Sequence, residues 1–284
     1  EEYATSVRKK KKDRIIFLLI CFMLQLGIMG LFVKCGNDND FFNRVFREFT
    51  IRTSGEIKLS TGIYKGDTDF GYFFGEGTFS FNGGAIYTGK LENNKLKGYG
   101  KLKVPSEGTY KGDFLNSQKS GKGKFIWDDG AVYNGEWKND MMWGQGDYNT
   151  KNGASYKGTF KKNKLWNGTC EFKNDTGDYI LTYTSGKVST AAIEFKDGIK
   201  YVGNCTLDNI SGNGIMSYKN GDEYNGDFDN GKRNGNGAYR WKSGDEYDGT
   251  WNEDKMSGTG TYTYAKGITA SGSFDENLFV SGSY

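Results

Sequence analysis

The chain has 284 residues, of which 36% are hydrophobic, 16% are aromatic and 43 are glycine, a profile that disfavours helical bundles, parallel α/β sheets and disorder. It has no histidine and no CxxC pair, which excludes Ser-His-Asp and Cys-His catalytic arrangements, histidine-ligated metal sites and thiolate zinc clusters. The net charge of +3 comes from residues 1–14, because residues 15–284 carry 32 basic and 32 acidic side chains, a balance that offers no overall basic surface for nucleic acid and leaves only a local basic patch open.

The chain begins with a basic tail, residues 1–14, followed by an apolar run. Residues 15–33 contain one polar side chain, Gln25, and no charge, and as a helix they cover about 28 Å, close to the thickness of a bilayer core. Positive flanks stay inside, so the sequence predicts a single-pass transmembrane helix with its N-terminus in the cytoplasm or the mitochondrial matrix and the remaining chain outside. The alternative is a cleaved signal peptide, which has the same charge order; the run is longer than a usual signal core, and no A-x-A-like site follows it.

Residues 34–54 form a juxtamembrane linker with a short amphipathic helix. Phe42, Val45, Phe46 and Phe49 follow one another at helical spacing, and Asp40 is suited to be the N-cap. This helix has two alternative places, at the membrane interface or over the first open end of the domain that follows.

From Tyr64 onward a pattern recurs about every 23 residues. Counting each leading tyrosine as position 0, glycine stands at +2, a large apolar residue at +4, glycine at +11 and +13, and a large residue at +15. Alternating positions share one face of a strand, so each unit is expected to be a two-stranded hairpin. Pairs such as Asn152-Gly153 and Asn220-Gly221 are expected to close the hairpins before the next tyrosine. A lone hairpin is unstable. The expected fold is therefore all-β, an elongated twisted antiparallel sheet of about nine stacked hairpins over residues 55–284 with a degenerate C-terminal cap.

The glycines inside the strands need a physical reason, because glycine there costs about 0.5–1 kcal/mol relative to alanine. We expect the aromatic rings of one hairpin to lie across the glycines of its neighbours. The residues expected to build this repeated core are Tyr87, Gly89, Tyr110, Gly112, Phe114, Tyr133, Gly135, Trp137, Tyr224, Gly226, Phe228, Tyr247, Gly249 and Trp251.

The recurring YxGxΦ…GxG units resemble the MORN (membrane occupation and recognition nexus) repeat, for instance at Tyr224, Gly226, Phe228, Gly235 and Gly237. The resemblance covers about four-fifths of the chain. It implies a twisted antiparallel sheet that serves as an interaction scaffold, often at membranes, and some relatives have been linked to phospholipid binding. The units over residues 156–200 depart from the pattern, since both lack the glycines at +11 and +13. A kink, a bulge, a partner-binding step and neutral drift are the alternatives for this stretch.

Two pairs of side chains are candidates for special roles. Cys205 occupies a +4 position, and it is either a small buried hydrophobe or the partner of Cys170 in a disulfide. Trp143 and Trp166 stand at +10 of successive units, off the core register. They form either an exposed platform for a partner or packing at the rim of the hairpins.

The function predicted from these features is non-enzymatic. The chain is expected to be a membrane-anchored scaffold, an accessory structural subunit that binds protein partners in a membrane complex and contacts lipid through residues 15–33. The mitochondrial inner membrane and a bacterial plasma membrane both fit the charge order. The alternative is a surface module that binds a glycan or a lipid headgroup through Trp143 and Trp166. No catalytic residues, metal, cofactor, small-molecule substrate or nucleic acid are expected.

Overall fold

The computed structural model describes residues 52–69 and 72–284, and every regular element in them is a β-strand. The 21 strands belong to a single open antiparallel sheet, which confirms the all-β prediction. Their bounds are β1 (Arg52–Leu59), β2 (Gly62–Asp69), β3 (Tyr72–Phe81), β4 (Ile86–Glu92), β5 (Lys95–Val104), β6 (Gly108–Leu115), β7 (Gln118–Trp127), β8 (Val132–Lys138), β9 (Met141–Asn149), β10 (Ser155–Lys161), β11 (Lys164–Lys173), β12 (Gly177–Thr184), β13 (Lys187–Phe195), β14 (Lys200–Cys205), β15 (Ile210–Ser217), β16 (Glu223–Asp229), β17 (Lys232–Arg240), β18 (Glu246–Asn252), β19 (Lys255–Thr263), β20 (Thr269–Asp275) and β21 (Leu278–Ser283).

The predicted basic tail, the predicted transmembrane helix over residues 15–33 and the predicted amphipathic helix of the linker lie outside the described residues. Within residues 52–69 and 72–284, no helix has the length and apolar character that a membrane crossing requires.

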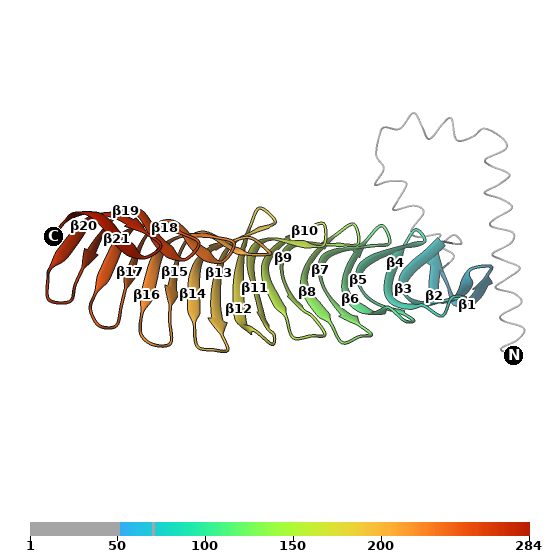
Figure 1. Ribbon diagram of the computed structural model, residues 1–284. Coiled ribbons are helices and arrows are strands. Elements are labelled where there is room, and N and C mark those ends of the chain that lie inside the picture. Colours follow the sequence, from blue (N-terminus) through green and yellow to red (C-terminus); the bar gives the residue numbers. More distant parts are fainter. Residues whose placement is uncertain (1–51, 70–71) are drawn as a thin grey trace, which may run out of the picture. The chain divides into compact units, whose positions relative to one another are not determined.

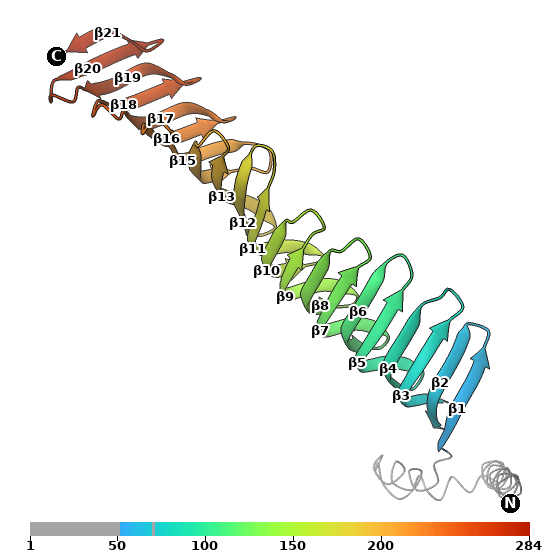
Figure 2. The same ribbon diagram turned by 90° about the horizontal axis from the view of Figure 1, so that it is seen from below.

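The described residues form two compact units. The first contains residues 52–69, 72–83 and 88–95, and the second contains residues 84–87 and 96–284. In the first unit β2 pairs with β1 and β3, and the ring of Tyr64 is fully buried against Phe73, with ring centroids 4.2 Å apart. In the second unit each strand from β6 to β21 pairs with the strand before it in the chain, so the hairpins follow one another in order (Figure 1, Figure 2).

Tight turns lie at the +6 and +7 positions of the units, a different place from the one predicted. Eight residue pairs there have positive φ at both positions, for instance Asn116 (50°) and Ser117 (66°), the backbone of a type I′ turn. The Asn-Gly pairs before each next tyrosine belong to longer loops that join one hairpin to the next. The sequence therefore predicted the right kind of turn residue at the wrong end of the hairpin. Each strand of a meander has a connection at both ends, and the tight turn is the one at +6 and +7.

The core of each hairpin is its leading tyrosine. Tyr87, Tyr110, Tyr133, Tyr201, Tyr224 and Tyr247 are all fully buried in the second unit. The hydroxyl of Tyr110 donates to the carbonyl of Asp113 at 3.0 Å, so burial leaves no polar group unsatisfied. The +4 ring of each next hairpin packs edge-on against this tyrosine: the centroids of Trp137 and Tyr110 lie 5.3 Å apart at 82°.

The glycines at +2 and +13 are covered by the tyrosine of their own hairpin, which corrects the prediction that neighbouring hairpins cover them. A Cβ on Gly226 would lie 2.6 Å from the hydroxyl of Tyr224, and one on Gly237 would meet the same ring. Gly226 and Gly237 are paired directly across the hairpin. The tyrosine ring therefore lies over the paired glycines of its own hairpin. The rings that contact a neighbouring hairpin are those at +4.

The turns of successive hairpins are linked by hydrogen bonds 21 residues apart. The Asp140 carboxylate accepts from the backbone N–H of Lys119 at 2.8 Å, and the Asn163 amide oxygen accepts from that of Met142 at 2.7 Å. The backbone of the same turns adds a second bond, from Asp140 N–H to the Lys119 carbonyl at 3.1 Å. Hydrogen bonds of this kind contribute about 1 kcal/mol each, so they fix the stacking of one hairpin on the next.

Candidate functional site

The regular pairing of the second unit is interrupted on β11 and β12. From β5 to β11, and again from β14 to β21, glycine pairs with glycine across every strand pair, from Gly100 opposite Gly112 to Gly272 opposite Gly282. On β11, however, Gly168 lies opposite Tyr183 of β12. The glycine row of the first hairpins therefore ends here, and a new one begins at Gly203 of β14.

The tyrosine row moves by two residues at the same place. Tyr156 pairs with Cys170, which pairs with Leu181, whereas Tyr179 pairs with Phe172, two residues further along β11. Two residues of a strand correspond to about 6.7 Å. A shift of one residue would have turned every side chain to the opposite face, and a shift of two keeps the faces intact.

The step comes from one hairpin and one loop that are each a residue shorter than usual. Tyr156 pairs with Cys170 at +14 instead of +15. Tyr179 follows its loop partner Phe172 by seven residues, where Tyr133 follows Phe125 by eight. In the regular hairpin at Tyr110 the +2 glycine pairs with position +13, and two extra residues of β7 bulge out. In the hairpins at Tyr156 and Tyr179 position +2 pairs with +12, and only one residue bulges out. These are the two units in which the sequence lacks the glycines at +11 and +13. We call this change of register over residues 156–200 the register step.

The core adapts to the register step with other side chains. Cys170, Leu181 and Ala191 continue the first tyrosine row and are buried, while Tyr156 itself is only half-buried. Below them the rings of Phe172 and Tyr179 stack in parallel, with centroids 4.7 Å apart and an interplanar angle of 1°. The sheet therefore stays packed through the step.

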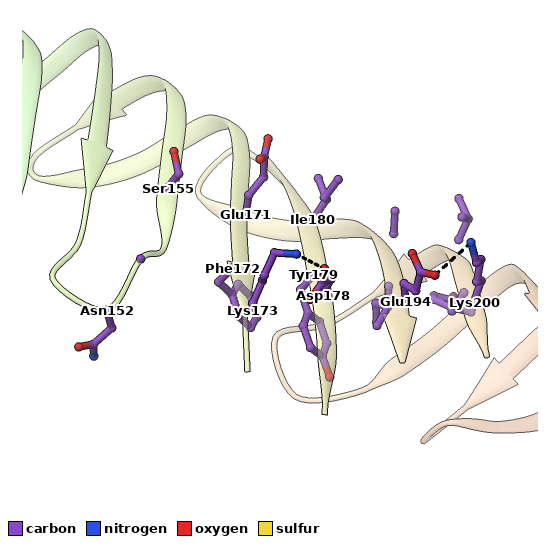
Figure 3. Close-up of a pocket in the computed structure, with 15 residues that line it drawn as sticks. Asn152, Ser155, Glu171, Phe172, Lys173, Asp178, Tyr179, Ile180, Glu194 and Lys200 are labelled. Carbon is purple, nitrogen blue, oxygen red and sulfur yellow. Dashed lines mark hydrogen bonds and ion pairs between the residues drawn. The ribbon is translucent and has the colours of Figure 1, made fainter. Parts of the chain in front are cut away.

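A groove of about 740 Å³ lies on the opposite face of the sheet at the register step. We call the face opposite the buried tyrosines the outer face. The side chains of Ile180, Ala192 and Val202 form the floor, since they lie directly opposite one another on β12, β13 and β14. Ile180 is 45% exposed and Val202 is 60% exposed. Figure 3 shows Ile180 and Glu171 on the side of the strands opposite the ring of Tyr179.

The two sides of the groove differ in polarity. One side is a row of charges in two ion pairs: Lys173 with Asp178, and Lys200 with Glu194 at 3.2 Å (Figure 3). The hydrogen bond to Asp178 raises the pKa of Lys173 above its usual value. The strand register places a row of uncharged polar residues on the other side: Thr169, Thr182, Thr190 and Asn204.

The apolar floor extends past the groove. Val202 lies opposite Ile215 of β15, which is 40% exposed. Along the same row the regular hairpins hold polar residues such as Asn225 on β16 and Asp248 on β18, and a shorter apolar pair, Ile126 and Val132, on β7 and β8. The row of Ile180, Ala192, Val202 and Ile215 is thus an exposed apolar strip across four strands. Sequence reasoning did not select these residues, although isoleucine and valine on successive strands, at positions that most regular hairpins fill with polar residues, were a visible signal.

The groove presents an apolar floor with charged and polar sides. The Asp178 and Glu194 carboxylates are exposed and ion-paired, Glu171 adds a third exposed carboxylate, and the floor holds no nucleophile. Among residues 52–69 and 72–284, no group of three or more Cys, Asp or Glu side chains is placed to hold a metal ion.

Trp143 and Trp166 lie half-buried on β9 and β11, and each is covered by a lysine of its own hairpin. The Lys138 ammonium lies 5.1 Å from the Trp143 ring centroid, and that of Lys161 lies 4.3 Å from the Trp166 centroid. Gly186 also lies against the Trp166 ring, since a Cβ there would be 3.0 Å from it. A lysine ammonium therefore lies over one face of each ring, and binding of a partner by Trp143 and Trp166 stays a prediction.

Cys170 and Cys205 are both buried and both free, so the disulfide considered from the sequence is not formed. They stand on β11 and β14, with β12 and β13 between them, which is about 14 Å at the usual strand spacing. A disulfide requires Cα atoms within about 7 Å. Burial raises the pKa of both thiols, which keeps them protonated.

Comparison with protein families finds six MORN repeats, at residues 87–108, 110–132, 133–155, 201–223, 224–246 and 247–269. The matched residues stop at 155 and resume at 201, on either side of the register step. MORN repeats indicate an interaction scaffold for proteins or membranes, and the family is typically non-enzymatic.

No curated protein matches the chain. Solved structures that match it include the G-box domain of the microcephaly protein CPAP, at 10% identity over 78% of this chain and 100% of that chain, with a TM-score of 0.26. Another is the TCP domain of SAS-4 (dCPAP) of Drosophila melanogaster in complex with a proline-rich motif of Ana2 (dSTIL), at 10% identity over 70% and 90%, with a TM-score of 0.24. A catalytically inactive virginiamycin B lyase from Staphylococcus aureus with quinupristin matches at 12% identity over 80% and 76%, with a TM-score of 0.13. At such TM-scores these similarities carry no function over to this chain.

Proposed function

We propose that this chain of MORN repeats is a non-enzymatic scaffold that binds an amphipathic helix of a partner protein in the groove at the register step. The single observation that supports this proposal most is the exposed apolar strip of Ile180, Ala192, Val202 and Ile215, bordered by charges on one side and by uncharged polar residues on the other. Exposed apolar rows bordered by polar residues mark interaction sites.

The dimensions of the strip favour a helix over an extended partner. Neighbouring strands are about 4.8 Å apart, so the four floor side chains span about 14 Å. Along one face of a helix, apolar side chains recur every 5–6 Å, and about ten residues cover 14 Å. Side chains on one face of an extended strand recur only every 6.7 Å or so, which does not match the floor. A helix with an apolar stripe at i, i+3 or i+4, and i+7 is therefore the expected occupant.

The sequence supplies the place where this scaffold works. Residues 15–33 are apolar and uncharged, and they follow a basic tail, so we propose that they anchor the chain as a single span with the repeats on the outer side. The partner is then another protein of the same membrane, and the chain is an accessory subunit of that complex. Protease protection of sealed membranes tests this arrangement: the repeats should be cleaved from the outer side only.

Photo-cross-linking from inside the groove tests the binding site. A photoreactive amino acid replaces Val202 in the full chain, and a control chain carries it at Thr261, which lies on the same row of the outer face in a regular hairpin. We expect one partner other than this chain to cross-link at position 202 and not at 261. Ile180→Asp should abolish that cross-link, and Asn225→Asp, with the same charge change on a regular hairpin, should leave it.

The position of the cross-link on the partner distinguishes the bound conformation. Cross-linked residues that recur three and four apart would support a bound helix. Equal cross-linking at positions 202 and 261, or recurrence every second residue, would contradict the proposal.

A further inference from the structure

The charge of the second unit divides at the register step. Residues 96–165 carry 13 basic and 7 acidic side chains, whereas residues 166–284 carry 11 basic and 17 acidic ones. The first stretch therefore has six more basic than acidic residues and the second has six more acidic than basic ones, so the two excesses cancel in the net charge. The two sides also present these charges on the same face of the sheet, the outer face.

The basic side has a compact patch on β5, β6 and β7. Lys101 lies opposite Lys111, and Lys111 lies opposite Lys124, so three exposed ammonium groups stand in line on neighbouring strands. Like charges directly opposite each other destabilise a sheet. Their presence is understandable if a negatively charged surface covers them. The basic patch consists of Lys101, Lys103, Lys111, Lys122 and Lys124, with one acid, Asp113.

The acidic side has a matching patch on β16, β17 and β18. Glu223, Asp227, Glu246 and Asp248 lie on the outer face of these strands and are exposed or partly exposed. Two basic residues lie beside them: Arg240 is paired with Glu246, with Nε and Oε2 3.2 Å apart, and Lys232 is paired with Glu253. The patch therefore keeps a negative excess.

We propose that two copies of this chain associate through their outer faces, in antiparallel order, so that the basic patch of each copy covers the acidic patch of the other. A two-fold axis makes both contacts at once and closes the pair. The centres of the patches are β6 and β17, so the axis passes between β11 and β12. The charge complementarity of the two patches is the observation that selects a second copy as the occupant.

The placement of the axis has a consequence for the groove. The groove is lined by β11 to β14 and borders the axis, so a pair formed in this way covers it. The second copy and a helical partner then compete for the outer face. The self-association does not depend on the groove residues, so it stands or fails independently of the proposed function.

Charge reversal in the full chain tests the pair. Two copies with different tags are mixed in a nonionic detergent, and the fraction captured together is measured at 50 and 500 mM NaCl. The basic-reversed variant carries Lys101→Glu, Lys111→Glu and Lys124→Glu. The acidic-reversed variant carries Asp227→Lys, Glu246→Lys and Asp248→Lys. A control carries Lys151→Glu, Lys162→Glu and Lys164→Glu, which makes the same charge change away from the patches.

We expect co-capture of the unaltered chain at 50 mM NaCl that falls at 500 mM, because salt screens exposed charges. Each reversed variant should lose capture of its own kind by about tenfold or more, since like charges then face each other. Mixing the two reversed variants should restore capture, because both contacts become attractive again, and the control should behave like the unaltered chain. No co-capture of the unaltered chain, or loss in both variants without restoration on mixing, would overturn the proposal.

Discussion

Gly168 on β11 lies directly opposite Tyr183 on β12, at the point where the regular hairpins of the second unit place glycine opposite glycine. Tyr183 occupies the position where a glycine would continue the row, so the row of paired glycines ends at Gly168. The hairpin at Tyr156 pairs its tyrosine with +14 instead of +15, and the loop from Phe172 to Tyr179 is one residue shorter than a regular loop, so together they move the tyrosine row by two residues. The groove lies on the outer face of the same strands.

The paired glycines are predicted to tolerate no side chain at all. Gly226→Ala should destabilise the protein by about 3 kcal/mol, because the new Cβ meets the Tyr224 hydroxyl, the Asn236 carbonyl and the Gly237 backbone. The ring cannot retreat, since Tyr224 is fully buried. Gly83→Ala is the control: a Cβ there meets nothing within 4 Å, and the expected change is under about 0.5 kcal/mol. Urea unfolding measures both, and equal effects would show that the rings do not constrain the glycines.

Replacing the residue at +9 by methionine is predicted to stabilise the protein in one hairpin and to destabilise it in another. The Lys119 ammonium lies 4.7 Å from the Trp137 ring centroid, but burial lowers the pKa of Lys119, so the folded state disfavours its charge. Lys119→Met, the residue that the next hairpin has at Met142, should stabilise by about 1 kcal/mol. Arg233 is held by Asp254 through Nε at 3.1 Å and Nη2 at 2.8 Å. Arg233→Met should therefore destabilise by about 1–2 kcal/mol. Urea midpoints that move in the same direction would contradict this account.

Stability is predicted to fall above pH 10. Burial raises the pKa of Tyr201 to about 12, with a smaller contribution from Cys205, and burial also raises that of Tyr156 to about 12. In the unfolded chain these hydroxyls ionise near pH 10. The folded state then holds protons that the unfolded state has lost, so this stability is complete below pH 10 and disappears as the pH rises through 12. Urea unfolding from pH 8 to 11 measures the slope, and Tyr201→Phe should flatten it. A stability that stays constant up to pH 11 would refute the prediction.

The sequence was sufficient to predict the repeating hairpin and its buried tyrosines. Both follow from the alternation of side chains within a strand and from the period of 23 residues between units, which can be seen in the sequence alone. It was insufficient for the contacts across strands. Which glycines a ring covers depends on the size of the bulge in β7 between the pairs Gly112–Gly123 and Phe114–Lys119. The spacing of the tyrosines does not reveal the size of this bulge.

The register step was visible in the sequence only as missing glycines and one interval of 22 residues between Tyr179 and Tyr201. The spacing did not show that the hairpin at Tyr156 and the loop after it are each one residue short. The groove was missed for the same reason, since Ile180 and Val202 become neighbours through Ala192 on the strand between them. Trp143 and Trp166 were conspicuous in the sequence, and the structure adds a lysine ammonium over one face of each ring.

Disulfide trapping with the native Cys170 tests the register step most directly. Cys21, Cys35 and Cys205 are replaced by serine, and a second cysteine is introduced by Leu181→Cys or by Ile180→Cys. Cys170 lies directly opposite Leu181, so the first variant should form the cross-link on mild oxidation and the second should not. Peptide mapping by mass spectrometry identifies the bond. A cross-link through position 180 and none through position 181 would mean that the regular register continues through these strands, and the step and its groove would not exist.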